Sequence, residues 1–162
     1  LICDLLTCAN FLELLGALIR DNSLGRLNPL HHHFLPNIGM CASMGSVLLS
    51  SGAKGKRSSL IYSKVMTHQV SHGTEGNVQD TRINQMEAEK YNYILFKILA
   101  ENCGKTFQEV LDFSARDRWY SSDEAMEFGL IDEVIGTDKN KSITNYLDGF
   151  DDYYKKEVLG SK

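Results

Sequence analysis

Apolar and polar positions follow recognisable periods from residue 38 onward, and they predict a mixed α/β domain. Gly39–Leu49 is first rich in small residues and then apolar, which predicts a tight corner from a strand into a helix. Gly52 is placed to end that helix. Residues 59–69 hold a β-rich run that predicts a strand. Strands that alternate with helices in this way are typical of α/β folds with parallel crossovers.

A long helix is predicted next, over residues 81–102, because its apolar residues recur at helical spacing. Asp80 is expected to be its N-cap, and Gly104 lies where a glycine commonly ends a helix.

Two short helices follow, each announced by a capping box. Thr106 and Ser121 both have a glutamate three residues later, and Gly129 ends the second helix. Residues 130–135 predict a final short strand. The polar tail that follows, 136–162, is expected to be a marginal helix or a flexible end.

The first 37 residues differ in character from the rest. Residues 1–20 have the spacing of an amphipathic helix, and Asp4 and Glu13 interrupt the apolar run, which argues against a signal peptide or a membrane span. Residues 21–37 carry loop-forming residues. The histidine tract 31–33 lies in this loop, and without a neighbouring cysteine or carboxylate it predicts a solvated segment and no metal site.

Composition narrows the functional classes. The 162 residues, of which 43% are hydrophobic and 23% charged, suit one soluble globular domain. The formal net charge is −4 and no basic block is present, so nucleic-acid binding is not expected. Four cysteines without a CxxC pair favour a reduced, cytoplasmic protein over a disulfide scaffold.

Three residues are candidates for nucleophilic chemistry. Ser43 lies at the predicted corner before a helix, where the N–H of Met44 can stabilise an oxyanion. His68 ends a β-rich run, and Asp117 lies between two arginines. Taken singly, each has a simpler interpretation: a helix cap for the serine, a core residue for the histidine, a surface ion pair for the aspartate.

Two further residues compete for these roles. His72 is an alternative base and Asp112 an alternative carboxylate, although both lie in looser sequence contexts. A base must reach the serine hydroxyl and have its second nitrogen held by a carboxylate, which is a condition on geometry.

Three ordered segments resemble one known family. The segments GMCASMGSVLLSSGAKGKR, VMTHQ and ARDRWYSSDEAMEFGLIDEVI together resemble the proteolytic subunit of the Clp protease, ClpP. The resemblance covers residues 38–135 as a catalytic domain, and leaves 1–37 as a divergent segment and 136–162 as a polar tail. It implies the ClpP/crotonase fold, a spiral of ββα units with a protruding handle helix.

The resemblance also implies roles for individual residues. Ser43 matches the family nucleophile, His68 the general base and Asp117 the third member of the triad, while Met44 matches one oxyanion-hole donor. The implied activity is serine-type endopeptidase cleavage of unfolded polypeptides.

Partners are implied as well. Asp80, at the start of the handle, and Arg116 match ring contacts of the family, whose subunits form stacked heptameric rings. The family is fed by a separate AAA+ unfoldase. Because the chain has no Walker A motif, ATP would be used by that partner, and no cofactor or metal is expected in this subunit.

Departures from the family pattern leave alternatives open. The family's NSPGG motif, which supplies the other oxyanion donor, is absent from residues 1–40, and Val70 and Ala115 stand where a proline and often an acid are usual. The gene is then either truncated or frame-shifted upstream of Ile38, or the opening is a genuine replacement. A non-catalytic subunit of a mixed ring is the main alternative function, and another crotonase-superfamily enzyme is the second.

Overall fold

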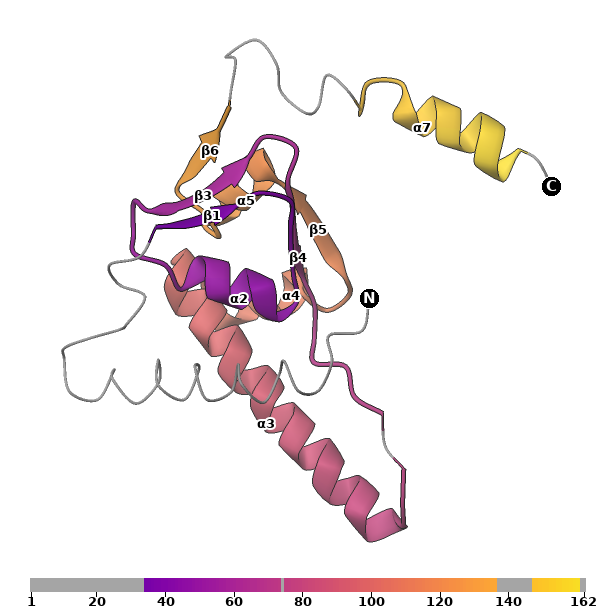
Figure 1. Cartoon of the computed structure of the whole chain (residues 1–162). Helices are drawn as coiled ribbons and strands as arrows, with labels where there is room; N and C mark the ends of the chain where they lie inside the picture. Colours follow the sequence, from indigo (N-terminus) through magenta and orange to yellow (C-terminus); the bar gives the residue numbers. More distant parts are fainter. Residues whose placement is uncertain (1–33, 74, 137–146, 161–162) are drawn as a thin grey trace.

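The computed structural model describes residues 34–73, 75–136 and 147–160 (Figure 1). The predicted N-terminal helix and the histidine tract 31–33 lie outside the described residues.

Two three-stranded sheets form the centre of the domain. In the first sheet, the order is β1 (Leu35–Asn37), β3 (Arg57–Leu60), β6 (Glu133–Ile135), all parallel. In the second, the order is β2 (Met40–Ala42), β4 (Lys64–Thr67), β5 (Arg118–Ser121), with β4 and β5 antiparallel. Each of the pairs β1–β2 and β3–β4 therefore sends one strand to each sheet. This arrangement confirms the expected succession of ββα units.

Strand boundaries depart from the sequence prediction in three places. The single strand predicted over residues 59–69 is divided into β3 and β4 by a turn at 61–63. The loop predicted over residues 21–37 is wrong at its end, where β1 forms. Pro36 is tolerated there because, among the described strands, β1 is an edge strand of its sheet, where a residue without an N–H need not break the ladder. The third departure is β5, which was not predicted because its first two residues are exposed and interrupt the apolar pattern.

Four helices accompany the sheets between residues 34 and 136: α2 (Met44–Ser50), α3 (Val78–Cys103), α4 (Phe107–Phe113) and α5 (Ser122–Phe128). The capping boxes at Thr106 and Ser121 are confirmed. Gly104 and Gly129 end α3 and α5 in the left-handed conformation, also as predicted.

The N-cap predicted for the long helix is wrong. Asn77, not Asp80, caps α3, and its side-chain oxygen accepts hydrogen bonds from the N–H groups of Gln79 and Asp80, each at 3.0 Å. Asp80 lies inside the first turn, where a carboxylate also suits the positive end of the helix. The exposed first turn has no apolar periodicity, so the pattern placed the helix start too late.

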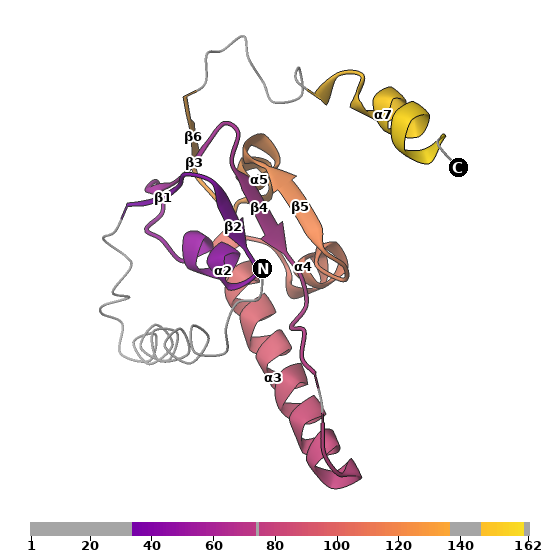
Figure 2. The same ribbon diagram turned by 45° about the vertical axis from the view of Figure 1, so that its right-hand side comes forward.

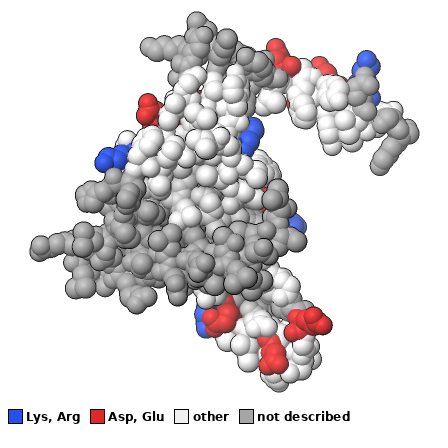
Figure 3. All heavy atoms as spheres, in the orientation of Figure 1, with Lys and Arg blue, Asp and Glu red and all other residues white. Residues whose placement is uncertain are grey.

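The C-terminal third of α3 anchors this helix in the core. Its buried residues Leu95, Phe96 and Leu99 belong to one cluster with Val47 of α2 and Val65 of β4. The remainder of α3 projects from the domain as the predicted handle (Figures 1 and 2). Acidic side chains gather around the projecting end (Figure 3).

The sequence left two alternatives for the tail, a marginal helix or a flexible end, and the described part of the tail is helical. A short α7 (Phe150–Tyr153) continues into a π-helix, η2 (Tyr154–Leu159), and both are drawn apart from the sheets (Figure 2). Among the described helices, none combines the length and apolarity required to cross a bilayer.

Candidate active site

Ser43 lies at a strained corner between β2 and α2. Its φ of 57° makes it the one described non-glycine residue with positive φ, and its ψ is −120°. Such a backbone costs about 1–3 kcal/mol and persists where surrounding bonds hold it. Here the Ser43 N–H donates to the Met66 carbonyl at 3.0 Å, and the Ser43 carbonyl accepts from the Ser46 N–H at 3.0 Å and its Oγ at 2.6 Å.

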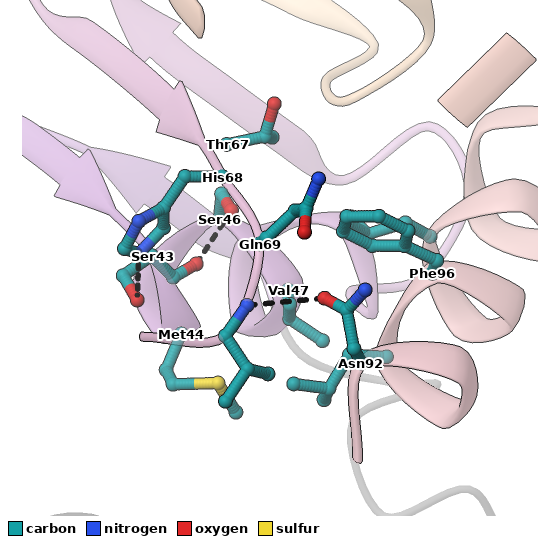
Figure 4. A pocket seen from close by; sticks show the side chains of 12 residues that line it. Ser43, Met44, Ser46, Val47, Thr67, His68, Gln69, Asn92 and Phe96 are labelled. Atoms are coloured by element: carbon teal, nitrogen blue, oxygen red, sulfur yellow. Dashed lines mark hydrogen bonds between the residues drawn. The ribbon is translucent and has the colours of Figure 1, made fainter. Parts of the chain in front are cut away.

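His68 reaches this serine because β2 and β4 are neighbouring parallel strands. Ala42 is in register with Met66, so the residues that follow each strand meet at one edge of the sheet. The His68 Nε2 lies 2.8 Å from the Ser43 Oγ, a hydrogen-bonding distance (Figure 4). His68 therefore meets the requirement that a base reach the serine hydroxyl.

Asp117 reaches His68 from the other side through the antiparallel pairing of β4 and β5. Thr67 is in register with Arg118, so the next residues outward, His68 and Asp117, face each other. The Asp117 Oδ1 lies 3.5 Å from the His68 Nδ1, an ion-pair distance longer than a good hydrogen bond. The three side chains are thus connected in the order Ser43, His68, Asp117, and each flanks the end of a different strand: β2, β4 and β5.

The residues directly before and after His68 each form one hydrogen bond to the loop that carries Asp117. The Ser114 Oγ donates to the Thr67 Oγ1 at 3.0 Å, and the Gln69 Nε2 donates to the Ala115 carbonyl at 3.3 Å. The sequence offered no signal for these bonds, because each joins residues more than forty positions apart.

Met44 is the first residue of α2, directly after Ser43. The first backbone N–H groups of an α-helix have no acceptor within the helix, so this N–H can serve an oxyanion that forms at Ser43. The family's second donor motif is absent from residues 1–40, of which residues 1–33 lie outside the described part of the chain.

A cavity of about 30 Å³ adjoins the Ser43–His68 pair. Apolar residues of α3, Leu95, Phe96 and Leu99, form part of its wall. Asn92 of the same helix also lines it, and its Oδ1 accepts a hydrogen bond from the Val70 N–H at 3.0 Å (Figure 4). A volume of this size is enough to hold a water molecule beside the two side chains.

The competing candidates are engaged elsewhere. The His72 Nε2 lies 3.0 Å from the Gln85 Oε1 on α3, and the Asp112 Oδ1 accepts from the Gln108 Nε2 at 2.7 Å.

Cys41, two residues before Ser43, is not set up as a nucleophile. Burial raises the pKa of its thiol, which disfavours the reactive thiolate.

The two predicted ring-contact residues lie outside the array. Asp80 is exposed near the projecting end of α3, where its Oδ2 accepts from the Asn77 Nδ2 at 2.6 Å. Arg116 is exposed in the loop before Asp117. Among the described residues, no group of three or more histidine, cysteine or acidic side chains is placed to hold a metal ion.

Comparisons with known proteins agree in one family. The family described as Clp protease matches residues 32–138. An ATP-dependent Clp protease proteolytic subunit from Bacteroides fragilis is 47% identical over 97 residues, which cover 60% of this chain and 47% of the relative. The subunit of the same name from Bacteroides thetaiotaomicron is 44% identical over 97 residues, covering 60% and 44%. The proteolytic subunit 2 from Corynebacterium efficiens is 41% identical over 98 residues, covering 60% and 49%. The chain spans about half the length of the curated relatives that it matches.

Proposed function

The chain belongs to the Clp protease family, and we propose that it is the serine-type endopeptidase subunit of an ATP-dependent Clp-like protease. The observation that carries the proposal is the 2.8 Å separation of the Ser43 Oγ and the His68 Nε2 at a strained strand-to-helix corner. An activated serine requires a base at this distance, and the corner presents its side chain beside the start of α2.

Acylation begins with attack of the Ser43 Oγ on the peptide carbonyl carbon. His68 Nε2 takes the hydroxyl proton, and the carbonyl oxygen becomes an oxyanion that the Met44 N–H stabilises. The C–N bond then breaks, and His68 returns the proton to the departing amine. The product that remains is an ester between the substrate and Ser43.

Deacylation repeats these roles with water as the nucleophile. His68 removes a proton from water, the hydroxyl adds to the ester, and Ser43 leaves with the proton that His68 gives back. Asp117 orients the imidazole through Nδ1 and stabilises its charged form. The reaction uses no cofactor, and ATP is consumed by a separate unfoldase.

We extend the proposal to the family's assembly and substrates. The chain is a subunit of stacked heptameric rings that receive unfolded polypeptides from an AAA+ unfoldase. The projecting part of α3 supports association, because several exposed apolar residues along one solvent-facing helix mark a protein contact. They are Val78, Ile83, Met86, Tyr91, Tyr93 and Ile94. Asp80 and Arg116 are proposed to join these ring contacts. A cytoplasmic location suits the free thiols of Cys41 and Cys103.

A fluorophosphonate probe tests the proposed nucleophile directly. The Ser43 Oγ attacks phosphorus, the P–F bond breaks, fluoride leaves, and His68 takes the proton. We expect the wild-type chain to be labelled and Ser43→Ala to remain unlabelled. Ser71→Ala is the matched control, because Ser71 is an exposed serine in the loop after β4 and should not change labelling.

The same experiment separates the catalytic proposal from the alternative of a structural subunit. A folded, assembled wild-type sample that takes up no probe would reject catalysis. Co-purification with a complete paralogue, with no change in ring activity on Ser43→Ala, would then identify a structural subunit.

A further inference from the structure

The chain that follows His68 lacks regular secondary structure and is tied to α3 by side chains. From residue 68 to residue 77, the described residues form neither helix nor strand. Asn92 accepts the Val70 N–H at 3.0 Å, and farther along Gln85 pairs with His72 at 3.0 Å. The first of these bonds lies two residues from the proposed base.

The position of His68 depends on how the chain is held on each side of it. On its N-terminal side, Thr67 is fixed by the pairing of β4 with β5. On its C-terminal side the sheet has ended, so Val70 is held by its packing against the core and by the bond to Asn92. Both Val70 and Asn92 are half-buried, which limits the access of water to this hydrogen bond.

Asn92 is a costly choice for the interior of a helix. Asparagine is a poorer helix former than alanine, leucine or lysine, so a structural role alone would favour one of those. Its amide oxygen is also directed toward the loop and the small cavity beside Ser43 and His68 (Figure 4). The contact serves the site more directly than it serves the helix.

We infer that Asn92 is a positioning residue for His68: by holding the Val70 N–H, it fixes the chain after β4 and keeps the imidazole within reach of Ser43. The inference rests on the proposed function of Ser43 and His68 and adds to it a residue of α3. The donor is a property of this chain, because proline, the residue usual at position 70 in the resemblance, has no N–H.

The test is saturation kinetics of fluorophosphonate labelling on the full chain, which separates probe binding (KI) from the chemical step (kinact). A small misplacement of a catalytic group slows chemistry, so we expect Asn92→Leu to lower kinact about tenfold with KI unchanged. Asn92→Asp keeps an acceptor oxygen and should restore kinact to within about twofold of wild type. A residue that only stabilised the fold would not lower kinact while leaving KI unchanged, and its effect would not be reversed by Asn92→Asp.

Two further variants define the interaction. Val70→Pro removes the donor but fixes the backbone at position 70 through its ring, as in the family, so it should label within about twofold of wild type, and Asn92→Leu should no longer slow labelling in this background. Gln85→Leu is the matched control, because it removes the other tether between this loop and α3 and should label as wild type does.

Amide hydrogen exchange gives a readout independent of labelling. The Val70 N–H should exchange faster in Asn92→Leu than in wild type, while the melting temperature shows whether the variant is folded. If Asn92→Leu does not fold, Asn92→Ala carries the kinetic comparison.

The outcomes distinguish this inference from the proposed function. A folded Asn92→Leu variant with wild-type kinact, with an unchanged kinact and a raised KI, or with the same loss in the Val70→Pro background, overturns the inference and leaves the proposed function standing. A wild-type chain that is folded but never labelled overturns the proposed function and the inference with it.

Discussion

The Asp117 carboxylate lies 3.5 Å from the His68 Nδ1, yet 67% of the Asp117 side chain is exposed, compared with 21% for His68. The pairing follows from the register of β4 and β5, which brings the two residues opposite each other where the ladder ends. Because water screens an exposed carboxylate, such a pair contributes about 0–1 kcal/mol. Asp117 in this arrangement orients the imidazole more than it stabilises a charge.

Replacement of this carboxylate should therefore have a modest effect. We expect Asp117→Asn to slow fluorophosphonate labelling about tenfold, well short of the roughly 10⁴-fold loss seen where a triad aspartate is buried. The ratio of wild-type to variant rates should fall as salt is raised to about 1 M, because salt screens exposed charges. Asp112→Asn, an exposed carboxylate on α4, is the control. A loss near 10⁴-fold that salt does not alter would contradict the prediction.

Much of the fold could be predicted because its signals are local. The capping boxes at Thr106 and Ser121 lie within four residues of the helices that they start. The small residues around Ser43 likewise announced a corner, and the segments that resemble the family located His68 and Asp117 beside it. In each case a short stretch of chain carries the information.

What could not be predicted depends on contacts between distant parts of the chain. The strand β5 exists because β4 lies beside it, since its own first residues are exposed. The bond from the Val70 N–H to Asn92 and the bond from Ser114 to Thr67 depend on where α3 and α4 pack. No periodicity in the sequence records these tertiary partners.

Arg57 is a further residue that the sequence did not single out, and it joins three helix ends. Its side chain is 2% exposed, and its Nε donates to the Asp132 Oδ2 at 2.8 Å. Its Nη1 donates to the carbonyls of Ser50, Asn102 and Gly129, at the C-terminal ends of α2, α3 and α5. The guanidinium thus satisfies carbonyl groups that the helices leave free.

This network predicts a loss of stability in acid. Hydrogen bonds and charge from Arg57 lower the pKa of Asp132 from 3.8 to about 2. Because the folded-state pKa is the lower one, the stabilisation is fully present above about pH 4 and is lost as the pH falls through 2. The shift corresponds to about 2 kcal/mol of unfolding free energy. Urea titrations between pH 7 and 2 should show that the difference between wild type and Asp132→Asn shrinks by that amount. Asp112→Asn is the control, and a constant difference over this range would refute the assignment.

Two glycines with the same backbone conformation should respond differently to alanine. Gly104 (φ 66°) and Gly129 (φ 96°) both end helices, so either alanine costs about 1–2 kcal/mol through backbone strain. A Cβ at Gly104 meets nothing within 4 Å, whereas at Gly129 it would lie 2.5 Å from the Cys103 carbonyl oxygen. We expect Gly129→Ala to lower the free energy of unfolding clearly more than Gly104→Ala, as measured by chemical denaturation. Equal losses would mean that the approach of α3 and α5 relaxes freely.

Cys103 should be protected from alkylation in the folded protein. It is buried at the end of α3, and this burial raises the pKa of its thiol from 9.0 to about 11. Since the thiolate is the reactive form, this shift alone lowers the reactive fraction at pH 8 about a hundredfold relative to the unfolded chain. Iodoacetamide labelling followed by peptide mass spectrometry should therefore modify Cys103 rapidly in urea and slowly in buffer. Gly129→Ala, which disturbs the contact with the Cys103 carbonyl, should accelerate labelling in buffer more than Gly104→Ala does. Rapid native labelling of Cys103 in the wild-type chain would show that the C-terminal end of α3 opens without global unfolding.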